Sequence, residues 1–138
     1  MSYSVVCGAD DAVAALLTER IGIAEWGAFT TIGVMKDGRL VGGFLYNNFR
    51  GYDLDISTAG ETGFLTRRTL RACFAYPFEQ LNCRRVTALV SKRNRASRRV
   101  VSGVGFRLEG VARQAHFTGA DLCIYGMLKN ECRWINGK

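Results

Sequence analysis

Three parts of the chain repeat apolar residues every three or four positions, the spacing that puts one apolar stripe on a helix. Each part is flanked by a residue suited to begin or end a helix. Gly22 follows the first part, Thr66 can cap the second and Asn94 can cap the third. The pattern therefore predicts helices over residues 10–21, 66–81 and 94–104.

The second helical pattern contains a proline, and the third has a clear apolar stripe. Pro77 is the only proline in the chain and lies inside the second helical pattern, where it removes one backbone hydrogen bond and pushes against the carbonyl of Cys73. We expect a kink there. In the third helix, Ala96, Val100 and Val104 form the apolar stripe.

Between the helices, apolar residues alternate with polar ones or run continuously, which predicts strands. Lys36, Asp37 and Gly38 separate two of them, and Asp-Gly accepts the positive φ of a tight hairpin. In residues 84–90, apolar residues fall on both faces of the expected strand, as in an inner strand covered on both faces. The expected strands are residues 3–7, 28–35, 39–47, 52–57, 84–90, 106–117 and 121–129.

The order of these elements predicts one α/β domain over residues 1–138, and its 48% hydrophobic and 22% charged residues are typical of globular chains. Residues 1–8 lack the basic start of a signal peptide, and no apolar run approaches a membrane span. The five cysteines form no C-x-x-C pair, which favours free thiols over disulfides or a zinc site. We therefore expect a cytoplasmic protein with no metal and no membrane segment.

The formal charge of +7 suits polyanionic partners such as coenzyme phosphates, nucleic acid or an acidic protein. Much of the excess lies between Arg84 and Arg99, and a run of this kind is most often a solvated face. No aromatic residues alternate with the basic ones to stack on bases, so nucleic acid is not the favoured partner.

Several spaced motifs in the second half of the chain resemble the GNAT N-acetyltransferases. They are the run FEQLNCRRV at residues 78–86, then Asn94-x-x-Ser97, and then Gly105-Phe106-x-x-Glu109-Gly110-x-x-Arg113. The likeness is strongest to the branch that acetylates ribosomal proteins, and to small phage-borne and bacterial relatives that share the ending Gly-Met-Leu-x-x-Glu-Cys-x-Trp.

The resemblance implies a GNAT fold, which is a mixed and mostly antiparallel central sheet with one splayed parallel strand pair and helices on both faces. It also implies acetyl-CoA as the acetyl donor, an amine as the acceptor, and direct transfer in a ternary complex. A protein N-terminus or lysine is the favoured acceptor, with a small-molecule amine as the alternative. We expect a monomer or a homodimer.

By the same resemblance, the donor lies against the strand after residue 55, the loop before the second helix, and the start of the third helix. The coenzyme-binding residues implied are Ile56, Ser57, Thr58, Gly63, Phe64, Leu65, Thr66, Arg67, Arg68, Asn94 and Ser97.

The chain departs from the family pattern at two places. Where the family carries Arg/Gln-x-x-Gly-x-Gly/Ala to wrap the pyrophosphate, this chain has Gly60-Glu-Thr-Gly63-Phe-Leu65. Where many members carry a tyrosine that protonates the leaving thiolate, this chain has Val101.

The expected catalytic residues are Asp55 as the base, with Ser97 or Tyr125 as the acid. Other roles are open for each of them. Asp55, with its neighbour Asp53, can pair with arginines, Ser97 can complete the first turn of a helix that Asn94 caps, and Tyr125 can be a core residue. A different class of function is also open, namely an inactive GNAT-fold module that binds a protein or nucleic acid through its basic face.

Overall fold

The computed structural model describes residues 2–23 and 25–136, and its centre is a seven-stranded mixed sheet with the order β1-β2-β3-β4-β5-β7-β6. All neighbouring strands are antiparallel except β4 and β5, which are parallel. This topology confirms the expected fold. The strands are β1 (Ser4–Cys7), β2 (Phe29–Lys36), β3 (Arg39–Asn47), β4 (Asp55–Gly60), β5 (Arg85–Ser91), β6 (Arg107–Ala112) and β7 (Leu122–Leu128).

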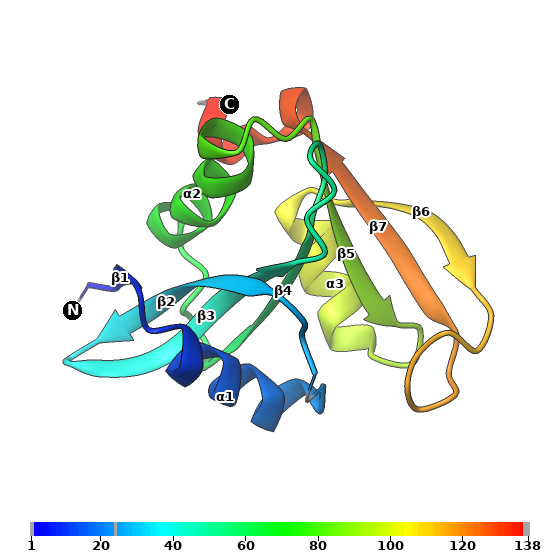
Figure 1. Cartoon of the computed structure of the whole chain (residues 1–138), viewed down its shortest axis with the longest axis horizontal. Coiled ribbons are helices and arrows are strands. Elements are labelled where there is room, and N and C mark those ends of the chain that lie inside the picture. Colours follow the sequence, from blue (N-terminus) through cyan, green and yellow to red (C-terminus); the bar gives the residue numbers. More distant parts are fainter. Residues whose placement is uncertain (1, 24, 137–138) are drawn as a thin grey trace.

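Helices cover both faces of the sheet (Figure 1). On one face, Val13 and Leu17 of α1 pack with Leu45 of β3, while the other face packs against α2 through residues such as Phe74. None of the helices formed by the described residues is long and apolar enough to cross a membrane. The helices are α1 (Asp10–Ile21), α2 (Arg67–Ala75), the π-helical turn η1 (Tyr76–Gln80), α3 (Arg95–Val104), the short 3-10 turn η2 (Lys129–Glu131) and α4 (Arg133–Asn136).

The predicted helix ends and hairpin are confirmed. Gly22 ends α1 in the left-handed conformation, and Thr66 caps α2 in a reciprocal pair of bonds with Thr69. Asn94 caps α3 by accepting a hydrogen bond from the Ser97 amide at 3.1 Å. Asp37 has φ +54°, as the tight turn between β2 and β3 requires.

Pro77 changes the helical geometry, as expected. The α-helical part ends at Ala75, and the chain continues through the π-helical turn η1. Proline leaves the carbonyl of Cys73 without its usual helical donor, and the Tyr46 hydroxyl of β3 donates to that carbonyl at 2.7 Å. The second helix is thereby joined to the sheet by a buried hydrogen bond.

Two strand predictions are wrong in their bounds. The strand expected over residues 52–57 is β4 at Asp55–Gly60, because the chain still turns before it, where the Arg50 amide donates to the Asp53 carbonyl at 2.8 Å.

The strand expected over residues 106–117 ends as β6 at Ala112, and residues 113–120 form a loop. The Asp121 carboxylate accepts from the Gln114 amide at 2.9 Å, and Gln114 has φ +55°, so the backbone turns out of the strand there.

The parallel strands β4 and β5 touch at one point. Their only register pair is Asp55 with Thr87, and the Thr87 amide donates to the Leu54 carbonyl at 2.9 Å. Beyond that pair the two strands diverge, with α3 at the opening between them (Figure 1). β5 is paired along its whole length with β7 instead, so the sheet consists of two halves joined at one bridge.

Five charged side chains reinforce this junction, and we call them the ionic network: Arg50, Asp53, Asp55, Arg85 and Glu109. Arg50 Nη2 donates to Asp53 Oδ2 at 2.7 Å and to Asp55 Oδ1 at 2.8 Å. Arg85 Nη2 donates to Glu109 Oε1 at 2.7 Å, and its Nε lies 3.5 Å from Asp53 Oδ2. The network therefore ties the segment before β4 to β5 and β6, across the junction of the two halves.

Asp53 is the central member of the network, and its removal should weaken the junction. Its buried carboxylate also accepts from Thr87 Oγ1 at 3.0 Å. We expect Asp53→Asn to lower the free energy of unfolding in urea by about 2 kcal/mol, because hydrogen bonds to a charged group are lost. The matched control is Asp37→Asn in the exposed hairpin turn, which asparagine fits equally well, with a change below about 0.5 kcal/mol. Equal effects of the two substitutions would contradict a stabilising role for the network.

Candidate active site

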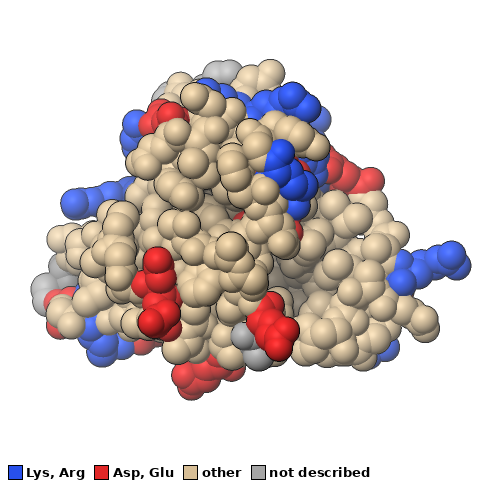
Figure 2. All heavy atoms as spheres, in the orientation of Figure 1, with Lys and Arg blue, Asp and Glu red and all other residues tan. Residues whose placement is uncertain are grey.

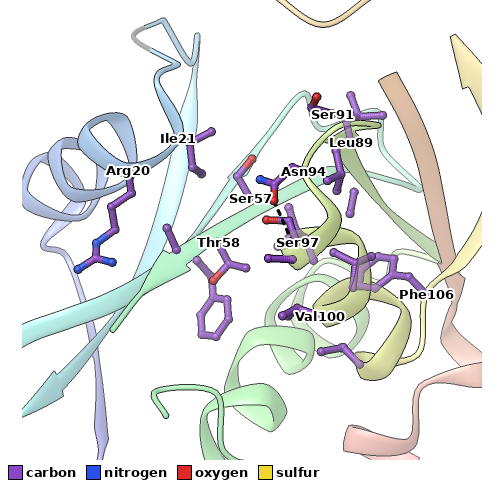
Figure 3. A pocket seen from close by; sticks show the side chains of 18 of the residues that line it. Arg20, Ile21, Ser57, Thr58, Leu89, Ser91, Asn94, Ser97, Val100 and Phe106 are labelled. Atoms are coloured by element: carbon purple, nitrogen blue, oxygen red, sulfur yellow. Dashed lines mark hydrogen bonds between the residues drawn. The ribbon is translucent and has the colours of Figure 1, made fainter. Parts of the chain in front are cut away.

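A cleft of about 860 Å³ lies where β4 and β5 diverge. Residues 56–60 of β4 form one side, and residues 88–91 of β5 with the start of α3 form the other (Figure 3). Seen from the side of α1, the cleft is a hollow between the part of the molecule that carries α1 and the part that carries β7, and its visible surface is mostly uncharged (Figure 2).

The walls of the cleft are apolar. Leu70 and Phe74 of α2 form one wall, and Val100 and Val104 of α3 form another. No residue of α3 is buried, and Val100 in its apolar stripe is 43% exposed. The stripe faces the cleft rather than the core, and an apolar chain bound in the cleft would cover it.

One strand edge of β4 faces the cleft. In a strand, every second residue points its backbone amide and carbonyl to the same edge. The Leu54 carbonyl points toward β5, where it accepts from the Thr87 amide, so the amide of Thr58, four residues later, points to that edge too. The amide of Ser57 points the other way, toward β3, as the Glu61 amide does when it donates to the Val41 carbonyl at 2.8 Å. Past the Asp55–Thr87 bridge, Thr58 therefore presents a backbone donor to the cleft.

The loop from Gly60 to Leu65 uses its glycines for packing as well as for turning. A Cβ on Gly60 would lie 2.7 Å from the Phe64 ring, and one on Gly42 would lie 2.6 Å from it. Both glycines therefore make room for the buried Phe64 side chain. Gly63 has φ +92°, a conformation that favours glycine.

Side chains at the start of α2 accept hydrogen bonds from some of the backbone amides there. Thr66 Oγ1 accepts from the Thr69 amide at 3.1 Å, and Thr69 Oγ1 accepts from the Thr66 amide at 2.8 Å. The amides of Arg67 and Arg68 have no partner among the described residues. Two donors thus remain free at this helix terminus.

The structure brings seven of the predicted coenzyme-binding residues to the cleft, namely Ile56, Ser57, Thr58, Phe64, Leu65, Asn94 and Ser97. Four others do not line it, namely Gly63, Thr66, Arg67 and Arg68. Ser97 lies in the first turn of α3 and Val101 one turn later, and both face the cleft. The position where many GNAT members carry a tyrosine is therefore at the cleft, with valine in its place.

Tyr125 and Asp55 lie outside the cleft lining. Tyr125 is 2% exposed, and its hydroxyl accepts from Arg98 Nε at 3.0 Å. Asp55 precedes the first cleft residue of β4, and its carboxylate accepts from Arg50 and, at 2.9 Å, from Asn48 Nδ2. Tyr125 is therefore a buried core residue, and Asp55 is paired with an arginine, as the alternative roles given for them in the sequence analysis require.

Sequence reasoning missed the residues that reach the cleft from distant segments. Arg20 and Ile21 come from the end of α1, and His116 and Phe117 come from the loop after β6. Phe117 lies close to Gly22, where an added Cβ would be 3.2 Å from its ring. The left-handed Gly22 signals that the chain turns here, but no local pattern shows that it turns toward the cleft.

The sequence matches one curated protein over part of its length. The probable N-acetyltransferase YjcK of Bacillus subtilis is 35% identical over 95 residues, which are 65% of this chain and 51% of that protein. The chain thus spans about half the length of this curated relative. No family model matches the sequence.

Solved structures of acetyltransferases share the fold. The spermidine/spermine N-acetyltransferase SpeG of Vibrio cholerae aligns with a TM-score of 0.77 over 99% of both chains, at 14% identity. The ribosomal-protein-S5-alanine acetyltransferase of Vibrio fischeri aligns with a TM-score of 0.70 over 95% of both chains, at 18% identity. A probable acetyltransferase is 28% identical, with a TM-score of 0.67 over 75% of this chain and 63% of that one. The chain thus shares its fold with solved acetyltransferases, and part of its sequence is similar to a probable N-acetyltransferase.

Proposed function

We propose that this protein transfers the acetyl group of acetyl-CoA to an amine, by direct attack in a ternary complex. The observation that carries the proposal is the cleft between β4 and β5, which has apolar walls and an inward-facing amide at Thr58. Such a cleft fits the long, mostly uncharged pantetheine arm of the coenzyme. The bound coenzyme would supply an activated acetyl thioester, and the protein has to position and polarise it.

The Thr58 amide is the donor best placed to polarise the thioester carbonyl. Its direction is fixed by the pairing of β4 with β3, so no reorganisation is needed when negative charge develops on the carbonyl oxygen. The amide of Ile56 shares its edge but lies beside the Asp55–Thr87 bridge. We therefore assign the oxyanion-stabilising role to Thr58 rather than to the whole of residues 56–58.

Ser97 is our candidate to protonate the leaving thiolate. Its side chain lies at the cleft on the first turn of α3, while its amide is held by Asn94. Tyr125 serves less well, because it does not line the cleft and its hydroxyl is bound by Arg98. The hydroxyl of Ser97 can donate a hydrogen bond to a sulfur beside it.

Asp55 is our candidate to receive the amine proton through a water molecule. An amine with a pKa of about 10.4 is largely protonated at neutral pH and must lose a proton before it can attack. The Asp55 side chain is 12% exposed and shares the α1 face of β4 with Ser57. Arg50 and Asn48 fix its orientation and leave lone pairs for a water.

A protein amine is the acceptor that the charges around the cleft favour. The described residues that line it include Arg20, Arg93 and His116 and no aspartate or glutamate, which does not suit a small polycation. The carboxylates of the ionic network are already paired with two arginines. Leu89 is 45% exposed on the open sheet face beside the cleft, where it can contact apolar side chains of a polypeptide.

Acetyl-CoA should stabilise the protein against heat. At a ligand concentration one hundred times its Kd, we expect a gain of about 2.7 kcal/mol, which corresponds to roughly 8–10 °C in Tm for a domain of this size. Differential scanning fluorimetry measures the shift. Coenzyme-dependent acetylation of an alanine-starting peptide, assayed beside spermidine, then tests the acceptor. No shift, together with salt-sensitive binding to nucleic acid, would support the inactive binding module instead.

Ser97→Ala should lower kcat about tenfold to a hundredfold and leave the KM for acetyl-CoA nearly unchanged, because it removes only the proton donor. The matched control is Ser102→Ala, on the exposed part of the same helix, with unchanged kcat. Steady-state kinetics with the peptide acceptor provide both values. Unaltered kcat in the Ser97 variant would remove this hydroxyl from the mechanism.

Asp55→Asn should lower turnover at neutral pH about a hundredfold without weakening acetyl-CoA binding, because it removes a base. The pH–rate profile separates this role from a structural one. The acidic limb of the wild-type profile should disappear in the variant, whereas a merely destabilised protein would keep the limb at lower amplitude. A retained limb would therefore argue against Asp55 as the base.

A further inference from the structure

Positive charge from three separate elements surrounds the loop between β4 and α2. Arg39 Nη2 donates to Glu61 Oε1 at 3.3 Å. The pKa of Glu61 is held below its ordinary value, first by this hydrogen bond and the charge of Arg39, and then by the charges of Arg20 and Lys36. Glu61 is the only carboxylate in residues 60–65. Asp37 also lies near Arg39, so three cations accompany two carboxylates here, and the surroundings of the loop are positive overall.

Arg20 is the one of these three cations that lines the cleft. It lies at the end of α1, and its Nη1 donates to the Gly60 carbonyl at 3.1 Å. Figure 3 shows it beside the end of β4, across the cleft from Asn94 and Ser97. A guanidinium carries five N–H donors in a fork that suits phosphate, so most of its donors remain available.

The same loop offers unpaired backbone donors. The amides of Thr62, Gly63 and Leu65 have no partner among the described residues, and neither have the first two amides of α2. Successive free amides beside a helix start form a concave site for anions. A cation held at the edge of such a site adds a full positive charge to the partial positive charges of the amides.

We propose that Arg20 binds the pyrophosphate of acetyl-CoA together with the amides of this loop. The inference rests on the proposed function. In the family motif the first position is arginine or glutamine, and here that position is Gly60, the residue whose carbonyl Arg20 contacts. The cation missing from the loop is thus supplied by a helix some forty residues earlier in the sequence.

Arg20→Gln tests the proposal without removing the contact to the loop, because the glutamine amide can still donate to Gly60. We expect acetyl-CoA to bind about tenfold more weakly, as measured by isothermal titration calorimetry, because one charge-assisted contact is lost. S-acetylpantetheine, which has the thioester and the arm but no phosphate, should bind equally well to both proteins. Arg20→Lys should recover part of the affinity for acetyl-CoA. Arg107→Gln, on the outer strand β6, is the matched control and should change neither affinity.

The outcomes separate this inference from the proposed function. If the wild-type protein binds neither donor, the proposed function fails. If the wild type binds acetyl-CoA and Arg20→Gln binds it within twofold, the proposed function stands and the role of Arg20 is wrong. If Arg20→Gln weakens both donors equally, Arg20 acts through the loop structure rather than on the phosphates, and the proposal is also overturned.

Discussion

The single bridge between Asp55 of β4 and Thr87 of β5 is the constraint on which the rest of the structure depends. A parallel pair that continued would bury the edge of β4 in ladder hydrogen bonds and close the sheet. Because the pair stops after one register position, the Thr58 amide faces open space, and the walls of α2 and α3 stay apart. The cleft is therefore a direct consequence of how short this pairing is.

A junction of one bridge needs reinforcement, and the ionic network provides it with side chains. Asp53 and Asp55 are buried, and a buried carboxylate is costly unless it is paired. Arg50 and Arg85 supply those partners and carry the connection on to Glu109 of β6. In the proposed function, this pairing disfavours a polycationic acceptor, and Arg20 beside the loop after β4 binds phosphate. Stability and ligand preference follow from one distribution of charge.

Local patterns predicted most of the fold, because caps and turns depend on neighbouring residues. Gly22, Asp37, Thr66 and Asn94 all act as their residue types suggest. The patterns failed where a distant element decides the outcome. The sequence predicts the α3 stripe but cannot tell whether the stripe faces a cleft or the interior, and it gives no sign of Arg20 at the cleft because the contact with Gly60 spans forty positions. Likewise, the partners of Asp55 depend on the turn at residues 48–50.

Amide hydrogen exchange, resolved by residue, tests the central claim most directly, since that claim concerns backbone donors that have no partner among the described residues. Exchange is measured by NMR with and without saturating acetyl-CoA. The account predicts that the amides of Thr58, Thr62 and Gly63 become strongly protected, while amides of the outer strand β6 change little. Protection that leaves Thr58 and this loop unchanged would contradict the claim that the open edge of β4 receives the thioester.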